Sequence, residues 1–227
     1  MVNQDAVTAR VVIVGEAGVG KSSLLVRFVR DQFTGFGGAT IGVEFNAKQV
    51  SAAERQVKLQ CWDCAGAERF RAISRSYFRG YAAAILVFDL GSRESFQALD
   101  YWLNELRQNC KNPPNRDYGP PIIVLGNKCD AAQVVTREEI DAWCRVENLP
   151  HYFEVSAKNG NNVHRSFASL AQLLSDSIEL AQSNEVDPRK VIQGLTFASD
   201  IMMPSDVQVR LTRKDSKQEL KQRCWWF

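Results

Sequence analysis

The chain has 227 residues, which suits one globular domain of ordinary size with a buried core, followed by a tail. Its formal net charge of +2 gives no support for a nucleic-acid-binding function. No apolar run approaches the roughly 18 to 20 residues that a membrane span needs, and residues 1–10 are too short and polar for a signal peptide. The composition therefore favours a soluble globular protein.

Six cysteines are present, and their spacing forms no dense disulfide framework, which favours a reducing, cytosolic setting. One pair, Cys61 and Cys64, forms a C-x-x-C sequence. A zinc site would need a second such pair, and a redox site would need a thioredoxin-like context. We therefore interpret both residues as plain thiols at the end of a strand.

Apolar runs alternate with amphipathic stretches, which predicts an α/β fold. The predicted strands are Arg10–Gly15, Val43–Val50, Gln56–Asp63, Ala83–Asp89, Ile122–Gly126 and Tyr152–Ser156. The predicted helices are Lys21–Arg30 and residues 94–110, 136–147 and 162–182. The second and third strands resemble a hairpin, and the others predict an open, mostly parallel sheet with helices on both faces. Ligands of such sheets bind beyond the carboxyl ends of the strands.

We expect a folded domain at residues 8–182 and a flexible tail at 183–227, because the periodic pattern of strands and helices stops there. Within the tail, Val191–Met203 has apolar residues at roughly helical spacing, which would suit docking on a partner. Gly194 and the polar neighbours favour disorder of this segment instead.

A glycine-rich turn joins the first strand to the first helix. Residues 15–22 read GEAGVGKS and fit the pattern G-x-x-x-x-G-K-[ST]. Glycines let backbone N–H groups converge on phosphate oxygens, and the N-terminus of the following helix adds a partial positive charge. We expect Lys21 to bridge the β- and γ-phosphates of a nucleotide and the Ser22 hydroxyl to ligate magnesium. The predicted phosphate-binding residues are Gly15, Glu16, Ala17, Gly18, Val19, Gly20, Lys21, Ser22 and Ser23.

The base is indicated by residues 126–130 (GNKCD), which follow a buried strand and contain N-K-x-D. An ionised Asp130 only accepts hydrogen bonds, and guanine offers it two donors that adenine lacks at that edge. Asn127 is expected to hold loops together or to reach N7 of the base, and the stem of Lys128 to lie over the base. The sequence SAK at 156–158 would direct a backbone N–H at guanine O6. The predicted base-binding residues are Asn127, Lys128, Asp130, Ser156, Ala157 and Lys158.

Two further segments would sense the third phosphate. Asp63 and Gly66 lie in D-C-A-G at the end of a strand, where Asp63 would hold magnesium through a water and the Gly66 N–H would meet the γ-phosphate. Thr40, in A-T-I-G-V-E-F, is placed to ligate magnesium and the γ-phosphate from the other loop. Loss of that phosphate would release both segments, which is an order–disorder switch. Phe33 is expected to pack edge-on against the guanine, with core packing as the alternative.

These motifs give the chain a resemblance to the Rab branch of the Ras superfamily. The shared stretches are IGVEF (41–45), KLQCW (58–62), RFRAI (69–73), YFRGY (77–81) and LVFDL (86–90). The resemblance implies a P-loop NTPase three-layer fold, with a mostly parallel six-stranded sheet that has one antiparallel strand. It implies GTP, GDP and Mg²⁺ as ligands.

The resemblance also implies protein partners: a guanine-nucleotide exchange factor, a GTPase-activating protein, effectors, and a GDP-dissociation inhibitor or escort protein. The effector-facing residues of the family match Ile41, Phe45, Trp62 and Tyr77. Core packing is the alternative interpretation of the three aromatic residues.

One departure from the family lies beside the expected γ-phosphate. Rabs usually carry W-D-T-A-G-Q-E, whereas residues 62–68 of this chain read W-D-C-A-G-A-E. Ala67 thus takes the place of the glutamine that orients the attacking water, and a methyl group cannot form hydrogen bonds with it. We predict intact nucleotide binding and slow intrinsic hydrolysis, with Lys21, Thr40 and Gly66 as the remaining catalytic contacts. The alternative is that a neighbouring group or a partner protein supplies the missing contact.

The last four residues, C-W-W-F, resemble a C-a-a-X prenylation box with Cys224 as the modified residue. One lipid chain holds a membrane only marginally, so an upstream basic cluster would supply a second signal. This cluster contains Arg210, Arg213, Lys214, Lys217, Lys221 and Arg223. Two tryptophans are unusual in such a box, and most Rabs end with two cysteines. The alternative is an unmodified tail whose aromatic residues insert at a membrane interface directly.

Two functions fit the sequence. The first is a switch that cycles between GTP and GDP at the cytosolic face of endomembranes and recruits effectors for vesicle traffic. The second is a GTP-bound scaffold or binding module with negligible hydrolysis. The complete motif set favours the first and Ala67 favours the second. A nucleotide kinase would need an arginine-bearing lid and an acceptor site, and we find neither in the sequence.

Overall fold

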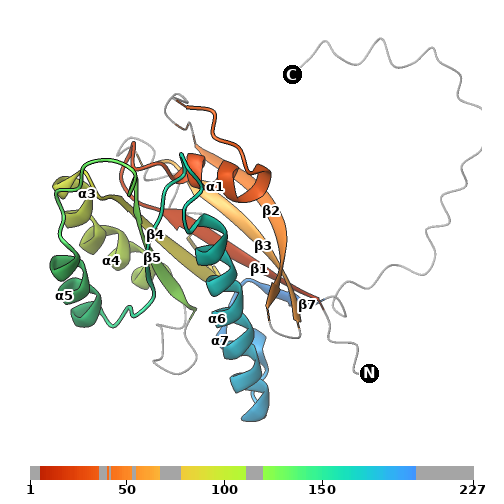
Figure 1. Ribbon diagram of the computed structural model, residues 1–227. Helices are drawn as coiled ribbons and strands as arrows, with labels where there is room; N and C mark the ends of the chain where they lie inside the picture. Colours follow the sequence, from red (N-terminus) through yellow and green to blue (C-terminus); the bar gives the residue numbers. More distant parts are fainter. Residues whose placement is uncertain are drawn as a thin grey trace, which may run out of the picture.

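The computed structural model describes residues 6–35, 40, 42–52, 55–66, 78–110 and 120–197, which form a sheet covered by helices (Figure 1). The strands are β1 (Val7–Val14), β2 (Val43–Ala52), β3 (Arg55–Cys64), β4 (Ala83–Asp89), β5 (Ile122–Asn127), β6 (Tyr152–Glu154) and β7 (Leu195–Phe197). The helices are α1 (Lys21–Arg30), α3 (Arg93–Gln97), α4 (Leu99–Asn109), α5 (Arg137–Glu147), α6 (Val163–Ser183) and α7 (Pro188–Val191).

The main path of the sheet runs in the order β2-β3-β1-β4-β5-β6. All neighbours along it are parallel except β2 and β3, which form the expected antiparallel pair. The predicted α/β fold with a mostly parallel six-stranded path is therefore confirmed. Because the five parallel strands end at one edge, the loops that follow them gather there.

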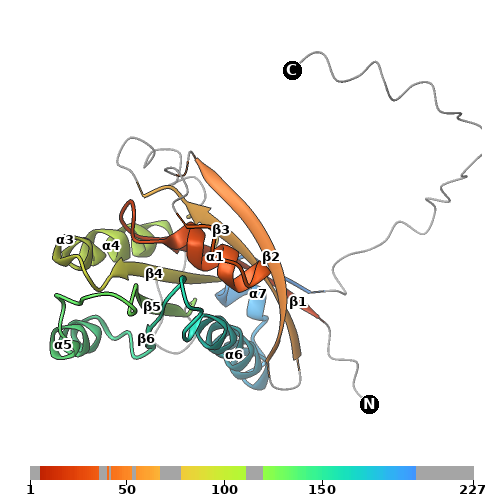
Figure 2. The ribbon, with the colours of Figure 1, turned by 45° about the horizontal axis from the view of Figure 1, so that its top comes forward.

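Helices cover both faces of the sheet (Figure 2). Residues of α1 and α6, such as Phe28 and Phe167, pack on one face, with their rings stacked at 3.9 Å between centroids. Residues of α4 and α5, such as Trp102 and Ile140, pack on the other face. The strand β4 lies between these two cores, and its AAILVF run is buried throughout, as its unbroken apolar sequence predicts.

The two cysteines of the C-x-x-C sequence face opposite sides of the sheet. Successive side chains of a strand alternate between faces, so residues three apart cannot share one. Cys61 packs in the core beside α1 and α6, and Cys64 packs in the core beside α4. Burial raises the pKa of both thiols to about 12. Thiols on opposite faces of a strand cannot bind one metal ion together, and no cluster of three or more potential metal-binding side chains occurs in the described ranges.

Some predicted boundaries differ from the observed ones. β1 begins at Val7 rather than at Arg10, and β6 ends at Glu154 rather than at Ser156. The helix expected at 94–110 is divided at Ala98 into α3 and α4. Among the helices that the structure describes, none is long and apolar enough to cross a bilayer.

The domain boundary predicted near residue 182 is wrong, because ordered structure continues to Phe197. After α6 the chain forms α7, in which Asp187 caps the helix by accepting from the Arg189 N–H at 3.0 Å, and then the short strand β7. β7 pairs antiparallel with the start of β1, with Val7 opposite Phe197. The remainder of the expected tail, 198–227, lies outside the described residues.

The reason for this extension is an open edge on β1. β4 pairs with β1 only from Val11 onward, so the backbone groups of the first part of β1 would lack a partner on that side. β7 supplies the partner, while Ile192 becomes fully buried and Leu195 nearly so. The expected disorder of Val191–Met203 is thus wrong as far as Phe197.

Replacement of Gly194 should loosen this extension. Gly194 has φ +71°, and a Cβ there would overlap the Gly80 carbonyl oxygen and lie 3.1 Å from the Ala82 nitrogen. We expect Gly194→Ala to lower the free energy of unfolding by about 2 to 3 kcal/mol, measured by urea titration. Gly35→Ala is the matched control, because Gly35 has φ +73° but open space around it. Equal losses in both variants would show that β7 packing contributes nothing beyond backbone strain.

Candidate functional site

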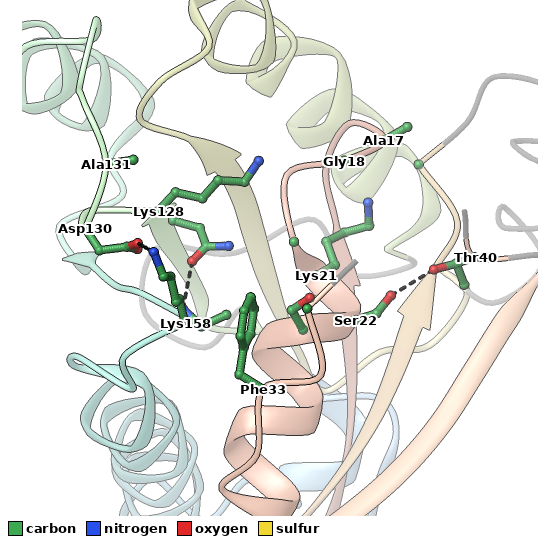
Figure 3. Close-up of a pocket in the computed structure, with 16 residues that line it drawn as sticks. Ala17, Gly18, Lys21, Ser22, Phe33, Thr40, Lys128, Asp130, Ala131 and Lys158 are labelled. Carbon is green, nitrogen blue, oxygen red and sulfur yellow. Dashed lines mark hydrogen bonds and ion pairs between the residues drawn. The ribbon is translucent and has the colours of Figure 1, made fainter. Parts of the chain in front are cut away.

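The loops at the carboxyl edge of the sheet enclose a pocket of about 720 Å³ (Figure 3). Its lining contains all the predicted nucleotide-binding residues except Gly15, Glu16, Val19 and Ser156. Gly35 and Ala131, which the sequence did not indicate, also line it. The volume falls within the usual range for small-molecule sites, about 300 to 1,000 Å³. Motifs separated by more than a hundred residues therefore meet in one cavity.

One end of the pocket is built for an anion. Helix α1 begins at Lys21, and its N-cap Gly20 provides no side-chain cap, so the first-turn N–H groups remain available to a ligand. The Lys21 side chain is only 6% exposed, and its Nζ donates to the carbonyl oxygens of Gly15 at 2.9 Å and Glu16 at 2.8 Å. Burial lowers the pKa of Lys21, and the carboxylate of Asp63 opposes this effect.

Three oxygen-bearing side chains converge beside Lys21. The Ser22 hydroxyl lies 2.8 Å from the Thr40 hydroxyl and donates a hydrogen bond to Oδ2 of Asp63. Asp63 is fully buried, and its Oδ1 finds no hydrogen-bond partner among the described residues. Burial raises the pKa of Asp63 to about 6, against the opposing effects of Ser22 and Lys21. Hydroxyl and carboxylate oxygens suit Mg²⁺, so these residues fit the predicted metal.

Gly66 packs directly against the phosphate-binding loop. A Cβ on this residue would lie 2.5 Å from the Gly15 carbonyl oxygen and 2.6 Å from the Ala17 nitrogen. Only glycine allows the end of the D-C-A-G segment to come this close. The next residue along the chain, Ala67, lies outside the described residues, and so does Ile41 after Thr40.

At the other end of the pocket, Asn127 ties three loops together. Its Nδ2 donates to the Val19 carbonyl oxygen at 2.7 Å, and its Oδ1 accepts from the Ala157 N–H at 3.2 Å. Of the two roles expected for this residue, the structure shows the one that holds the loops. Asn127 is 1% exposed, which makes the loss of either bond costly.

Asp130 is held as an ionised acceptor at the pocket wall. Its Oδ1 accepts from the Ser156 hydroxyl at 2.5 Å, and its Oδ2 lies 3.6 Å from Nζ of Lys158. The Ser156 hydrogen bond is the main reason that the pKa of Asp130 is lowered. Ser156 is itself buried and acts through Asp130 and the loop rather than at the cavity surface.

The walls of this end come from Lys128 and Phe33. Lys128 pairs with Asp89 at 2.7 Å between Nζ and Oδ2, and its stem lines the pocket. Phe33 is 42% exposed and lines the pocket, so its alternative placement in the core is wrong (Figure 3). A flat aromatic ligand would fit between polar edges and these apolar surfaces.

Two supporting residues had no sequence signal. Arg27 of α1 donates to carbonyl oxygens of the loop at 157–158, and Trp102 of α4 donates from Nε1 to Oε1 of Glu16 at 3.1 Å. Both contacts join residues far apart in the chain and belong to no short motif. Pairings of this kind follow only from the assembled fold.

The expected effector residues fall partly within the described ranges. Phe45 is 48% exposed, so its alternative placement in the core is wrong, and its ring lies 4.9 Å from the half-buried ring of Trp62. Tyr77, Ile41 and Cys224 lie outside the described residues. The Phe45–Trp62 pair forms an exposed aromatic surface on the β2–β3 hairpin.

Comparison with known proteins identifies the family, because a sequence profile of the Ras family matches residues 10–176. The chain belongs to the Ras family. Rab-4A of Danio rerio is 40% identical over 187 residues, which cover 82% of this chain and 83% of that protein. Rab-4A of Rattus norvegicus is 38% identical over 209 residues, 91% of each chain, and Rab-7b of Paramecium octaurelia is 35% identical over 225 residues, 98% of each.

These relatives place the chain in the Rab branch, as the sequence motifs indicated. Ras-family proteins are GTPases that bind GTP and GDP, typically with Mg²⁺, and Rab proteins interact with exchange factors, GTPase-activating proteins, effectors and a GDP-dissociation inhibitor. The anion-binding end, the oxygen cluster and the acidic wall of the pocket are what such a ligand set requires.

Asp63→Asn should stabilise this Rab in the absence of nucleotide and metal. The pKa of Asp63 is about 6 in the folded protein and 3.8 ordinarily, so between these pH values the folded state binds a proton that the unfolded state does not. Above pH 6 the buried carboxylate is ionised, and its ionisation lowers the free energy of unfolding. That cost is lost as the pH falls through 6 toward 3.8. We expect the free energy of unfolding of the variant to exceed that of the wild type by about 2 kcal/mol at pH 7 and to equal it near pH 4.

Urea unfolding of EDTA-treated protein measures this difference across the pH range. With GTP and Mg²⁺ present the order should reverse, because the variant loses a ligand-side carboxylate. A stability difference that does not change with pH would contradict the assigned cause.

Proposed function

We propose that this Rab-family chain is a GTP/GDP switch with slow intrinsic hydrolysis, which recruits effectors for vesicle traffic. The observation that carries the proposal is one pocket that is lined by Lys21 at its anion-binding end, then by Ser22 and Thr40, and by Asp130 at its base-binding end. The buried carboxylate of Asp63 accepts a hydrogen bond from Ser22 beside this lining. This order matches the triphosphate, Mg²⁺ and guanine of GTP.

Slow hydrolysis is supported by the contacts of Gly66 together with the identity of its neighbour. Gly66 packs on the phosphate-binding loop and lines the pocket, and Ala67 is its direct neighbour in the sequence. A glutamine there would orient water, whereas the methyl group of Ala67 offers no hydrogen bond. Binding depends on other residues, so the GTP state should persist.

A second candidate function also follows from the missing glutamine. If hydrolysis is negligible even with a GTPase-activating protein, the chain is a GTP-bound scaffold that is regulated by exchange or abundance. The missing glutamine favours this candidate, and the intact Lys21 and Thr40 contacts favour a switch that a partner can still activate.

Single-turnover measurement of phosphate release tests whether Ala67 slows the hydrolysis of bound GTP. We expect the wild type to hydrolyse bound GTP slowly and Ala67→Gln to raise the rate at least tenfold, because one positioned hydrogen-bonding group is worth about 10²-fold in such sites. Ala67→Met is the control, since methionine has similar length without the amide. A wild-type rate that neither substitution changes would contradict slow hydrolysis through Ala67.

Membrane attachment is proposed through Cys224 and the basic residues before it. A prenyl chain would anchor this Rab at the cytosolic face of endomembranes, with the basic cluster as the second signal. The proposed partners are a guanine-nucleotide exchange factor, a GTPase-activating protein, effectors, and a GDP-dissociation inhibitor or escort protein. We propose that the Phe45–Trp62 surface forms part of the effector contact.

Intact mass of the full chain from a eukaryotic host measures this modification. We expect an isoprenoid adduct on Cys224 that is absent from the Cys224→Ser variant. The terminal Phe favours a geranylgeranyl group as this adduct. An unmodified wild-type mass, with membrane partition unchanged by Cys224→Ser, would leave direct insertion of the aromatic ending as the mode of attachment.

A further inference from the structure

The Arg27 side chain crosses from helix α1 to the loop that follows β6. Its Nε donates to the Ala157 carbonyl oxygen at 2.9 Å and its Nη2 to the Lys158 carbonyl oxygen at 2.7 Å. Its Nη1 donates to the Asp31 carbonyl oxygen at 2.8 Å, at the end of its own helix. The side chain is 14% exposed, so a planar, permanently charged group is largely enclosed among these acceptors.

These contacts fix the orientation of the peptide groups that face the pocket. A peptide unit is planar and trans, so the Lys158 N–H points opposite to the Ala157 carbonyl that Arg27 holds. From the other side of the same loop, the Ala157 N–H is held by Oδ1 of Asn127. Both Ala157 and Lys158 line the pocket. Two side chains from different elements therefore set the direction of consecutive N–H groups.

Helix α1 links this support to the phosphate end of the site. Its first residues, Lys21 and Ser22, lie at the anion-binding end of the pocket, and Arg27 projects from the same helix to the loop at 157–158. One helix thus sets the distance between the residues that would contact the phosphates and the loop at 157–158, which would contact the base.

We propose that Arg27 is a positioning residue for base selection, which aims the backbone N–H of Lys158 at the 6-oxo group of a purine nucleotide. The proposal rests on the proposed guanine-nucleotide binding and names the residue that tunes it. Asp130 reads the opposite side of the base edge through the N1 and N2 donors, so Arg27 and Asp130 contribute separable parts of the selectivity.

Nucleotide analogues separate these two parts. GDP, 6-thioguanosine diphosphate and inosine diphosphate are compared by their dissociation rates from the full-length protein with Mg²⁺. Sulfur at position 6 accepts hydrogen bonds weakly, so the thio analogue reports on the 157–158 loop. Inosine diphosphate keeps the 6-oxo group but lacks the N2 amine, so it reports on Asp130.

Arg27→Met keeps the length of the side-chain stem and removes the hydrogen bonds. We expect this variant to release GDP about tenfold faster and to lose most of its preference for GDP over the thio analogue. The ratio of GDP to inosine diphosphate should stay unchanged. Arg27→Lys should be intermediate, because an ammonium cannot hold two consecutive carbonyls as a planar fork does. Arg30→Met, at the exposed end of the same helix, should match the wild type.

Two results would overturn the proposal. One is an Arg27→Met variant with unchanged rates and an unchanged preference for GDP over the thio analogue. The other is a rise in rate that is equal for all three nucleotides, which would mean that Arg27 only supports the fold. If Arg27→Met does not fold, Arg27→Lys carries the same comparison. A wild type that retains none of the three nucleotides would contradict guanine-nucleotide binding itself and is distinct from both results.

Discussion

The structure depends on a buried cation that lies beside a buried carboxylate, because each charge needs a partner. Lys21 is 6% exposed and Asp63 is fully buried, and burial opposes the charged form of each. Charges removed from water are costly unless they are paired and fully hydrogen-bonded. An anion facing Lys21 and a divalent cation facing Asp63 would satisfy both groups at once.

The fold maintains this arrangement by gathering loops on a rigid base. Five strands end at one edge, and buried contacts tie the loops that follow them to one another, above all those of Asn127 with Val19 and Ala157. The close approach of Gly66 to the phosphate-binding loop places the end of the D-C-A-G segment next to Lys21.

Most of the site could be predicted from the sequence because its residues occur in short motifs at strand ends. The turn GEAGVGKS, the sequence NKCD and the sequence SAK each carry their chemistry within a few residues. The extension at 188–197 was missed because its partner, the open edge of β1, lies at the other end of the chain. Arg27 was missed for the same reason, since the acceptors of its guanidinium are carbonyl groups, which no side-chain pattern reveals.

The central claim is that Asp130 makes this pocket select guanine while the α1 end binds phosphate. Competition of GDP and ADP for the protein tests it most directly, with wild type and Asp130→Asn side by side. The account predicts that wild type prefers GDP by at least on the order of 100-fold, and that the variant loses most of this preference while it still binds diphosphates. Equal binding of GDP and ADP by the wild type would contradict the account.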